Sequence, residues 1–142
     1  MEDMNSSKVI HLITTIERGG AEKQLLTLAS QQIKLGLIVV VFYLKGEPEL
    51  KIEFENLGVI VKQDLVNKGF ISQILIFKKY YKSYSSLVHA HLPKSELLAA
   101  ICCKAGTFIF TRHNSEPFWP RSPKIISNRL SRFVERRAAH GI

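Results

Sequence analysis

Two adjacent glycines, Gly19 and Gly20, follow the first apolar segment of the chain, at residues 9–13. Glycine has no side chain, so the backbone can come close to a ligand at these positions. A helical pattern begins at Ala21, and the free amides at the start of a helix attract phosphate. One interpretation is therefore an anion-binding turn. The other is a tight turn that needs glycine only for its φ angles, since the longer dinucleotide glycine pattern is absent.

Two histidines, His89 and His91, stand at the end of another short apolar segment. Side chains alternate between the faces of a strand, so the two rings are expected on one side. This spacing could hold a metal, but no cysteine, aspartate or third histidine follows closely, and zinc is not expected. We expect His89 to be buried and hydrogen bonded, and His91 to contact a ligand at the start of the loop.

Residues 111–116 read Thr-Arg-His-Asn-Ser-Glu and follow a further apolar segment. Such polar and charged groups need partners once they are partly buried. Their concentration at this place favours a binding role over a simple end to the strand. The alternative is that Arg112 and Glu116 form a surface ion pair of little energetic consequence.

Each of these polar segments follows a predicted strand. Strands are predicted at residues 9–13, 37–44, 58–61, 87–90 and 107–111, and helices at 21–36, 71–84, 96–104 and from the end of a proline-rich loop to about 139. This alternation predicts an α/β fold, a Rossmann-like parallel sheet with helices on both faces. Residues 37–44 are apolar throughout, as a covered central strand requires. Ligands of such sheets bind beyond the carboxyl ends of the strands, where the three polar segments lie.

The composition predicts one globular domain, residues 1–142, because 142 residues that are 46% hydrophobic supply one ordinary core. The longest apolar run, 37–44, is far shorter than the ~18 residues of a membrane-spanning helix. The polar, acidic start lacks the pattern of a secretory signal, so export is not expected. Cys102 and Cys103 are adjacent, which excludes an ordinary disulfide and fits a reducing cytoplasm.

The chain carries 20 Lys and Arg against 12 Asp and Glu, a net charge of +8 that attracts phosphates, anionic lipid headgroups or nucleic acid. Lys78, Lys79 and Lys82 form a basic side of the helix predicted at 71–84, and Arg129, Arg132 and Arg136 line one side of the last predicted helix. Such a face either docks on an anionic membrane or is simply solvated. Nucleic-acid binding is not expected, because the aromatic residues are not interleaved with the basic ones.

Three blocks together resemble the N-terminal domain of family 4 glycosyltransferases: Arg-Gly-Gly-Ala-Glu at 18–22, Val-His-Ala-His at 88–91 and Thr-Arg-His-Asn at 111–114. The resemblance spans residues 8–142 in order and spacing. It implies a retaining enzyme of GT-B architecture, with two Rossmann-like domains facing each other across a cleft. The acceptor would bind mainly to the N-terminal domain and the sugar nucleotide mainly to the other. Since the chain ends at the start of a predicted strand, we expect a truncated chain that lacks the donor-binding domain.

The resemblance also implies roles for individual residues. Gly19 and Gly20 would offer backbone amides to the diphosphate or transferred sugar of the donor. His113 would hydrogen bond the transferred sugar near the reaction centre. The acceptor side would be lined by polar residues of the second and third blocks: His91, Arg112, Asn114 and Glu116.

The implied activity is transfer of a sugar from a nucleotide-sugar to a glycan or lipid-linked acceptor, in bacterial surface polysaccharide or lipopolysaccharide synthesis. It would take place in the cytoplasm or on the inner face of the membrane. No metal or other cofactor is expected, because amide dipoles and basic side chains would stabilise the departing diphosphate. The alternative is a non-catalytic subunit that binds the acceptor or recruits a membrane for a separate catalytic partner. Without the donor domain, we expect the isolated chain to be nearly inactive.

Overall fold

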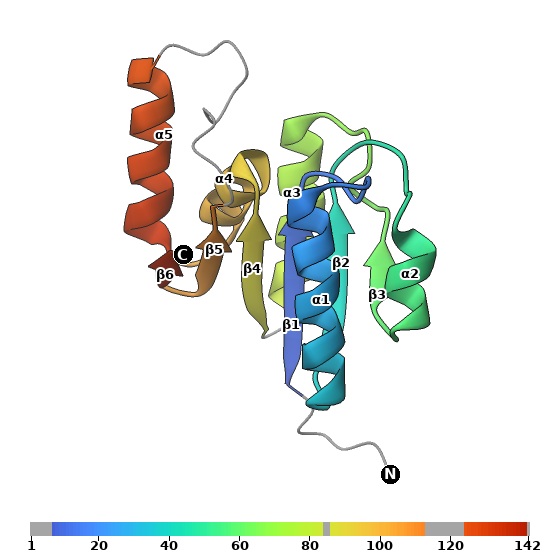
Figure 1. The fold of residues 1–142 in the computed structure, drawn as a ribbon. Coiled ribbons are helices and arrows are strands. Elements are labelled where there is room, and N and C mark those ends of the chain that lie inside the picture. Colours follow the sequence, from blue (N-terminus) through green and yellow to red (C-terminus); the bar gives the residue numbers. More distant parts are fainter. Residues whose placement is uncertain (1–6, 84–85, 113–123, 142) are drawn as a thin grey trace.

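Parallel strands form one continuous sheet in a computed structural model that describes residues 7–83, 86–112 and 124–141 (Figure 1). In these ranges the sheet has six strands in the order β3-β2-β1-β4-β5-β6. All neighbouring pairs are parallel. The strands are β1 (Lys8–Ile13), β2 (Ile38–Tyr43), β3 (Ile60–Lys62), β4 (Leu87–His91), β5 (Phe108–Thr111) and β6 (His140–Gly141).

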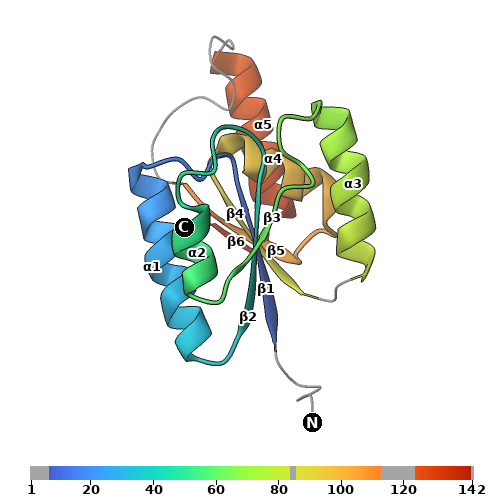
Figure 2. The same cartoon turned by 90° about the vertical axis from the view of Figure 1, so that its right-hand side faces the viewer.

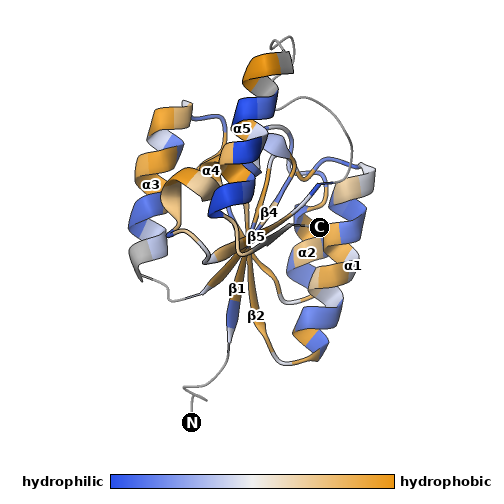
Figure 3. Ribbon diagram, turned by 90° about the vertical axis from the view of Figure 1, so that its left-hand side faces the viewer, coloured by the Kyte–Doolittle hydropathy of each residue, from blue (hydrophilic) through white to orange (hydrophobic). Residues whose placement is uncertain are grey.

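Helices cover both faces of the sheet (Figure 2). They are α1 (Gly20–Lys34), α2 (Lys51–Asn56), α3 (Phe70–Ser83), α4 (Pro93–Cys102) and α5 (Lys124–Arg137). The first two pack on one face, and the other three on the opposite face, with α4 in contact with both α3 and α5. In Figure 3 the strands and much of α4 are coloured as apolar, whereas several turns of α5 are coloured as polar.

The surroundings of strand β2 explain why its sequence is apolar throughout. Val39, Val41 and Tyr43 belong to the core beneath α1 and α2. Val40 and Phe42 point the other way, into the core beneath α3 and α4. Both faces of this strand are therefore buried, as expected of a parallel sheet covered on two sides.

The predicted Rossmann-like α/β fold is confirmed. Each predicted strand and helix has a counterpart, and the pattern at the end of the chain gives β6, which pairs with β5. The short helix α2 is absent from the prediction, because six residues with one fully buried side chain, Phe54, are too few to show a period. The helix predicted from residue 96 begins at Pro93, a residue well suited to a first helical position.

No helix in the described ranges is both long and apolar enough to cross a membrane.

The thiols of Cys102 and Cys103 give a first prediction. Both are buried and reduced, and burial raises the pKa of each to about 12. At pH 8 only about one thiol in ten thousand would be ionised, and the thiolate is the reactive form. We expect an aromatic disulfide reagent to leave the native protein unlabelled, and labelling to rise with unfolding in urea.

A matched control is Ser72→Cys, which adds a thiol at an exposed position on α3. That variant should show one fast-reacting thiol and two protected ones. Rapid labelling of two thiols in the unaltered native protein would contradict the buried placement of the pair.

Candidate functional site

The strand order reverses between β1 and β4, since the chain builds outward to β3 on one side and to β6 on the other. In open parallel sheets this reversal leaves a crevice outside the carboxyl ends of the two central strands, and ligands bind there. The arrows in Figure 1 all point to this edge. The segments that leave β1 and β4 therefore frame the candidate site, and both were singled out from the sequence.

The glycine turn after β1 supplies an open stretch of backbone. Gly19 caps α1 with φ at −149°, and Gly20 is the first helical residue. Neither has a positive φ, so backbone angles do not require glycine at either position. A Cβ at Gly19 would collide with the Glu22 carboxylate, whereas a Cβ at Gly20 would meet no atom within 4 Å. Gly20 therefore faces open space at the start of a helix.

Charges around this turn decide where an anion could approach. Thr15 Oγ1 donates to Glu22 Oε1 at 2.7 Å, which holds a carboxylate in the first turn of α1. Arg18 turns away toward α2, where its guanidinium pairs with Glu53 at 2.8 Å. The Gly19 side of the turn is thus already occupied by negative charge. The start of a helix favours an anion, and the open side of this turn is the Gly20 side.

Two lysines add positive charge at the same edge. Lys94 is the second residue of α4, and Lys45 lies two residues beyond β2. The pKa of Lys94 is lowered by burial and by the like charge of Lys45, which places the two cations near each other. The sequence did not single them out, because two lysines among 20 basic residues carry no distinguishing pattern.

Three histidines meet on the face of the sheet that carries α1. His89 and His91 lie on β4 with ring centroids 4.1 Å apart, and His11 on β1 has its centroid 5.2 Å from each. His89 is buried, with Nε2 2.7 Å from the Thr111 hydroxyl, as predicted. His91 is the last residue of β4 and only 2% exposed, so its expected position in the loop is wrong.

His11 was not predicted to join this group. The search for a third histidine followed the sequence after His91, whereas His11 reaches the cluster because β1 and β4 pair with His11 opposite His89. Its Nε2 donates to Gln32 Oε1 at 2.8 Å, and its Nδ1 accepts from His91 Nε2 at 3.0 Å. Burial lowers the pKa of His11 to about 4, although the Gln32 hydrogen bond raises it, so the ring is neutral near pH 7. The sequence signal that could have identified His11 is a histidine inside an otherwise apolar strand.

The connection from β4 to α4 is a single strained residue. Leu92 has φ at 73°, a region that side chains other than glycine rarely adopt. Its side chain packs against the core beneath α1 and α2, which helps to hold this conformation. The turn places Ser95 in the first turn of α4, where its hydroxyl lies 3.3 Å from that of Thr14 after β1. The two loops at the switch point are thereby joined.

Arg112, predicted on the acceptor side, forms an internal bridge. Its guanidinium donates to Glu96 at 3.0 Å, Glu135 at 3.1 Å and Ser131 at 2.9 Å. Glu96 is fully buried; burial raises the pKa of its carboxyl, and Arg112 opposes the shift. Arg112 therefore fastens the end of β5 to α4 and α5. The remaining predicted residues of this segment, His113, Asn114 and Glu116, lie outside the described residues.

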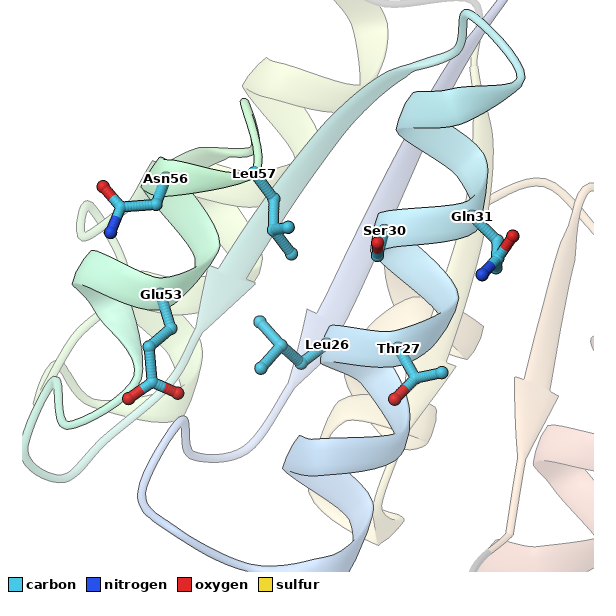
Figure 4. Close-up of a pocket in the computed structure, with 7 residues that line it drawn as sticks. All are labelled: Leu26, Thr27, Ser30, Gln31, Glu53, Asn56 and Leu57. Atoms are coloured by element: carbon cyan, nitrogen blue, oxygen red, sulfur yellow. The ribbon is translucent and has the colours of Figure 1, made fainter.

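A groove between α1 and α2 lies apart from these residues (Figure 4). It has a volume of about 440 Å³ and is lined by Leu26, Thr27, Ser30, Gln31, Glu53, Asn56 and Leu57. None of the residues predicted for the site lines it.

The strand order defines a Rossmann-like domain whose switch point lies between β1 and β4, beside the open turn after β1 and the segment after β4. A family model described as Glycosyltransferase Family 4 matches residues 18–142. The chain belongs to this family, so the predicted resemblance is confirmed and supports a transferase of the glycosyltransferase class. A comparison with curated proteins found no match to the sequence.

The bridge between Arg112 and Glu96 gives a second prediction. Removing one partner of a buried ion pair leaves an uncompensated charge, which costs about 3–5 kcal/mol when burial is complete. The Arg112 side chain is 26% exposed, so we expect Arg112→Met to lower the unfolding free energy by about 2–3 kcal/mol at pH 8 in urea titrations.

The pH dependence of this loss in unfolding free energy tests whether the buried charge of Glu96 causes it. Without Arg112, burial and the negative charge of Glu135 act unopposed on Glu96 and raise its pKa further above that of the unfolded chain. The folded state then binds the extra proton, so the deficit of the variant should shrink from pH 8 to pH 5. Arg18→Met, which breaks the exposed pair with Glu53, is the matched control and should cost under about 1 kcal/mol. Equal losses in both variants would contradict a buried bridge.

Proposed function

We propose that this chain is the acceptor-side domain of a retaining glycosyltransferase, which transfers a sugar from a nucleotide-sugar to a glycan or lipid-linked acceptor. Membership of glycosyltransferase family 4 supports the class of reaction. The observation that carries the proposal is the exposed backbone at Gly20, which opens into space at the start of α1 and beside the switch point. A sugar diphosphate could contact the helix amides at this position.

The first turn of α1 suits a developing negative charge. The first hydrogen bond of the helix runs from Lys23 N to Gly19 O, so the amides of Gly20, Ala21 and Glu22 lack partners within the helix. Their dipoles are fixed before any ligand arrives, which is the condition for stabilising a departing diphosphate efficiently. Lys45 and Lys94 would add positive charge at the same edge.

The other roles follow from family resemblance. His113 would hydrogen bond the transferred sugar near the reaction centre, with Asn114 and Glu116 on the acceptor side. His91 would act there too, from its buried position at the end of β4. Transfer itself would need no divalent metal. A second α/β domain would complete the donor site, and the acceptor would belong to bacterial surface polysaccharide or lipopolysaccharide synthesis.

The open backbone at Gly20 gives a third prediction. Because an added Cβ at this position meets no protein atom, Gly20→Ala should leave the melting temperature within about 2 °C of the parent. The methyl group would instead enter the space assigned to the ligand. In a protein that carries both domains, we expect turnover to fall at least tenfold, measured as nucleotide released from nucleotide-sugars with bacterial membranes as acceptor.

Gly69→Ala is the matched control, since Gly69 is also exposed, precedes a helix and would meet nothing within 4 Å. Equal turnover of the two variants would remove Gly20 from the donor site. Absence of turnover in the parent itself would favour the alternative, a non-catalytic subunit that binds the acceptor beside a separate catalytic partner.

We also propose that α5 attaches the protein to the inner face of an anionic membrane. Ile125 and Ile126 are 69% and 50% exposed near the start of this helix. Arg129, Arg132 and Arg136 are exposed along it, so apolar and basic groups share its outer surface. This combination is typical of helices that lie in a membrane interface.

Vesicle binding supplies a fourth prediction. The protein should sediment with vesicles of phosphatidylcholine and phosphatidylglycerol but weakly with phosphatidylcholine alone, and 0.5 M salt should release it. Arg129→Glu with Arg132→Glu should weaken binding at least tenfold. Lys23→Glu with Lys34→Glu makes the same charge change on exposed positions of α1 and should have a small effect. If both double variants lose binding equally, net charge rather than α5 is responsible.

A further inference from the structure

The three histidines on β1 and β4 have the arrangement of a metal-binding group. One ring nitrogen from each of His11, His89 and His91 lies within 4.8 Å of the corresponding atoms of the other two. All three side chains are buried, at 0%, 6% and 2% exposure. Neutral imidazole is a preferred ligand of zinc and of the neighbouring transition metals, but not of magnesium or calcium.

The backbone holds the three rings on one face of the sheet. His11 stands opposite His89 in the register of β1 and β4, and His91 is two residues further along the same strand. These strands occupy the centre of the sheet (Figure 1). Sites built on rigid strands keep their geometry better than sites on loops.

Hydrogen bonds orient the rings as metal ligands require. Gln32 Oε1 accepts the proton of His11 Nε2, so the neutral ring presents the lone pair of Nδ1 toward His91. Thr111 Oγ1 lies 2.7 Å from His89 Nε2, so Nδ1 is the nitrogen that His89 would present to an ion. Metal-binding histidines commonly hydrogen bond through the nitrogen that does not hold the ion.

The distance between the closest ring nitrogens is near the separation of two nitrogens that bind one zinc ion. His11 Nδ1 and His91 Nε2 are 3.0 Å apart. Two nitrogens about 2.0–2.1 Å from a tetrahedral zinc are separated by roughly 3.3 Å. The His11 and His91 nitrogens would therefore part slightly to admit an ion, and a pair as far apart as the 4.8 Å limit of the cluster would move closer together. The ion would replace the proton that His91 shares with His11, and that proton would leave to solvent.

We propose that His11, His89 and His91 together bind one Zn²⁺ ion, with a fourth position open to water or a ligand. The ion would join β1 to β4 beneath the switch point and fix the ring of His91. The zinc site is argued from the histidine cluster and not from the proposed sugar transfer, although His91 would belong to both. It departs from the expectation of no metal, because β1 supplies the third histidine that the sequence after His91 lacks.

Zinc binding by the full 142-residue chain tests the proposal. After treatment with a chelator, titration with Zn²⁺ followed by calorimetry and elemental analysis should give one ion per chain with micromolar or tighter affinity. His11→Gln, His89→Gln and His91→Gln should each weaken binding at least tenfold. His140→Gln, which alters a histidine on β6, two strands away from β4, is the matched control and should bind as the parent does.

Spectroscopy of the unaltered chain covers the case in which a variant fails to fold. Long-range ¹H–¹⁵N spectra should show His11 protonated at Nε2 without metal, and Zn²⁺ should shift the resonance of its Nδ1. Lack of binding at one ion per chain, an unshifted His11 ring, or equal affinity in His11→Gln and His140→Gln would each overturn the proposal. The three rings would then form only a hydrogen-bonded chain.

Discussion

The parallel pairing of β1 with β4 is the contact on which the candidate site depends. Its register sets His11 opposite His89 and Ile13 opposite His91. The same pairing brings the loop after β1 next to the loop after β4, where the hydroxyls of Thr14 and Ser95 meet. Strands that are distant in the sequence become neighbours only through the reversal of strand order. The histidine cluster and the contact between the segments that follow β1 and β4 therefore both result from the strand order of the sheet.

Local patterns in the sequence were sufficient to predict the fold. Burial on both faces makes β2 apolar throughout, and four-residue spacing marks the inner side of α1, as Leu25 and Ala29 show. The turn at Gly19 and Gly20 was also recognisable, because the two adjacent glycines separate the first strand pattern from the first helical pattern. These features depend on neighbours along the chain, and periodicity reports such neighbours well.

Features that depend on long-range contacts escaped prediction. The ring of His11 meets those on β4 across 80 positions of sequence, and the carboxylate of Glu96 meets Arg112 through the packing of α4 against β5. A single sequence indicates on which face of its strand or helix a side chain lies, but not which distant residue it contacts. The burial of His91 was misjudged for a local reason, because the strand continues one residue beyond the predicted end at residue 90.

The bridge made by Arg112 has a mechanical consequence. One guanidinium contacts α4 through Glu96 and α5 through Ser131 and Glu135. A force that pulls on α5 is therefore transmitted to the end of β5. The helix cannot be displaced as a rigid body without breaking this bridge or dragging the strand end with it. The outer helix α5, the helix α4 and the end of β5 thus form one mechanical linkage.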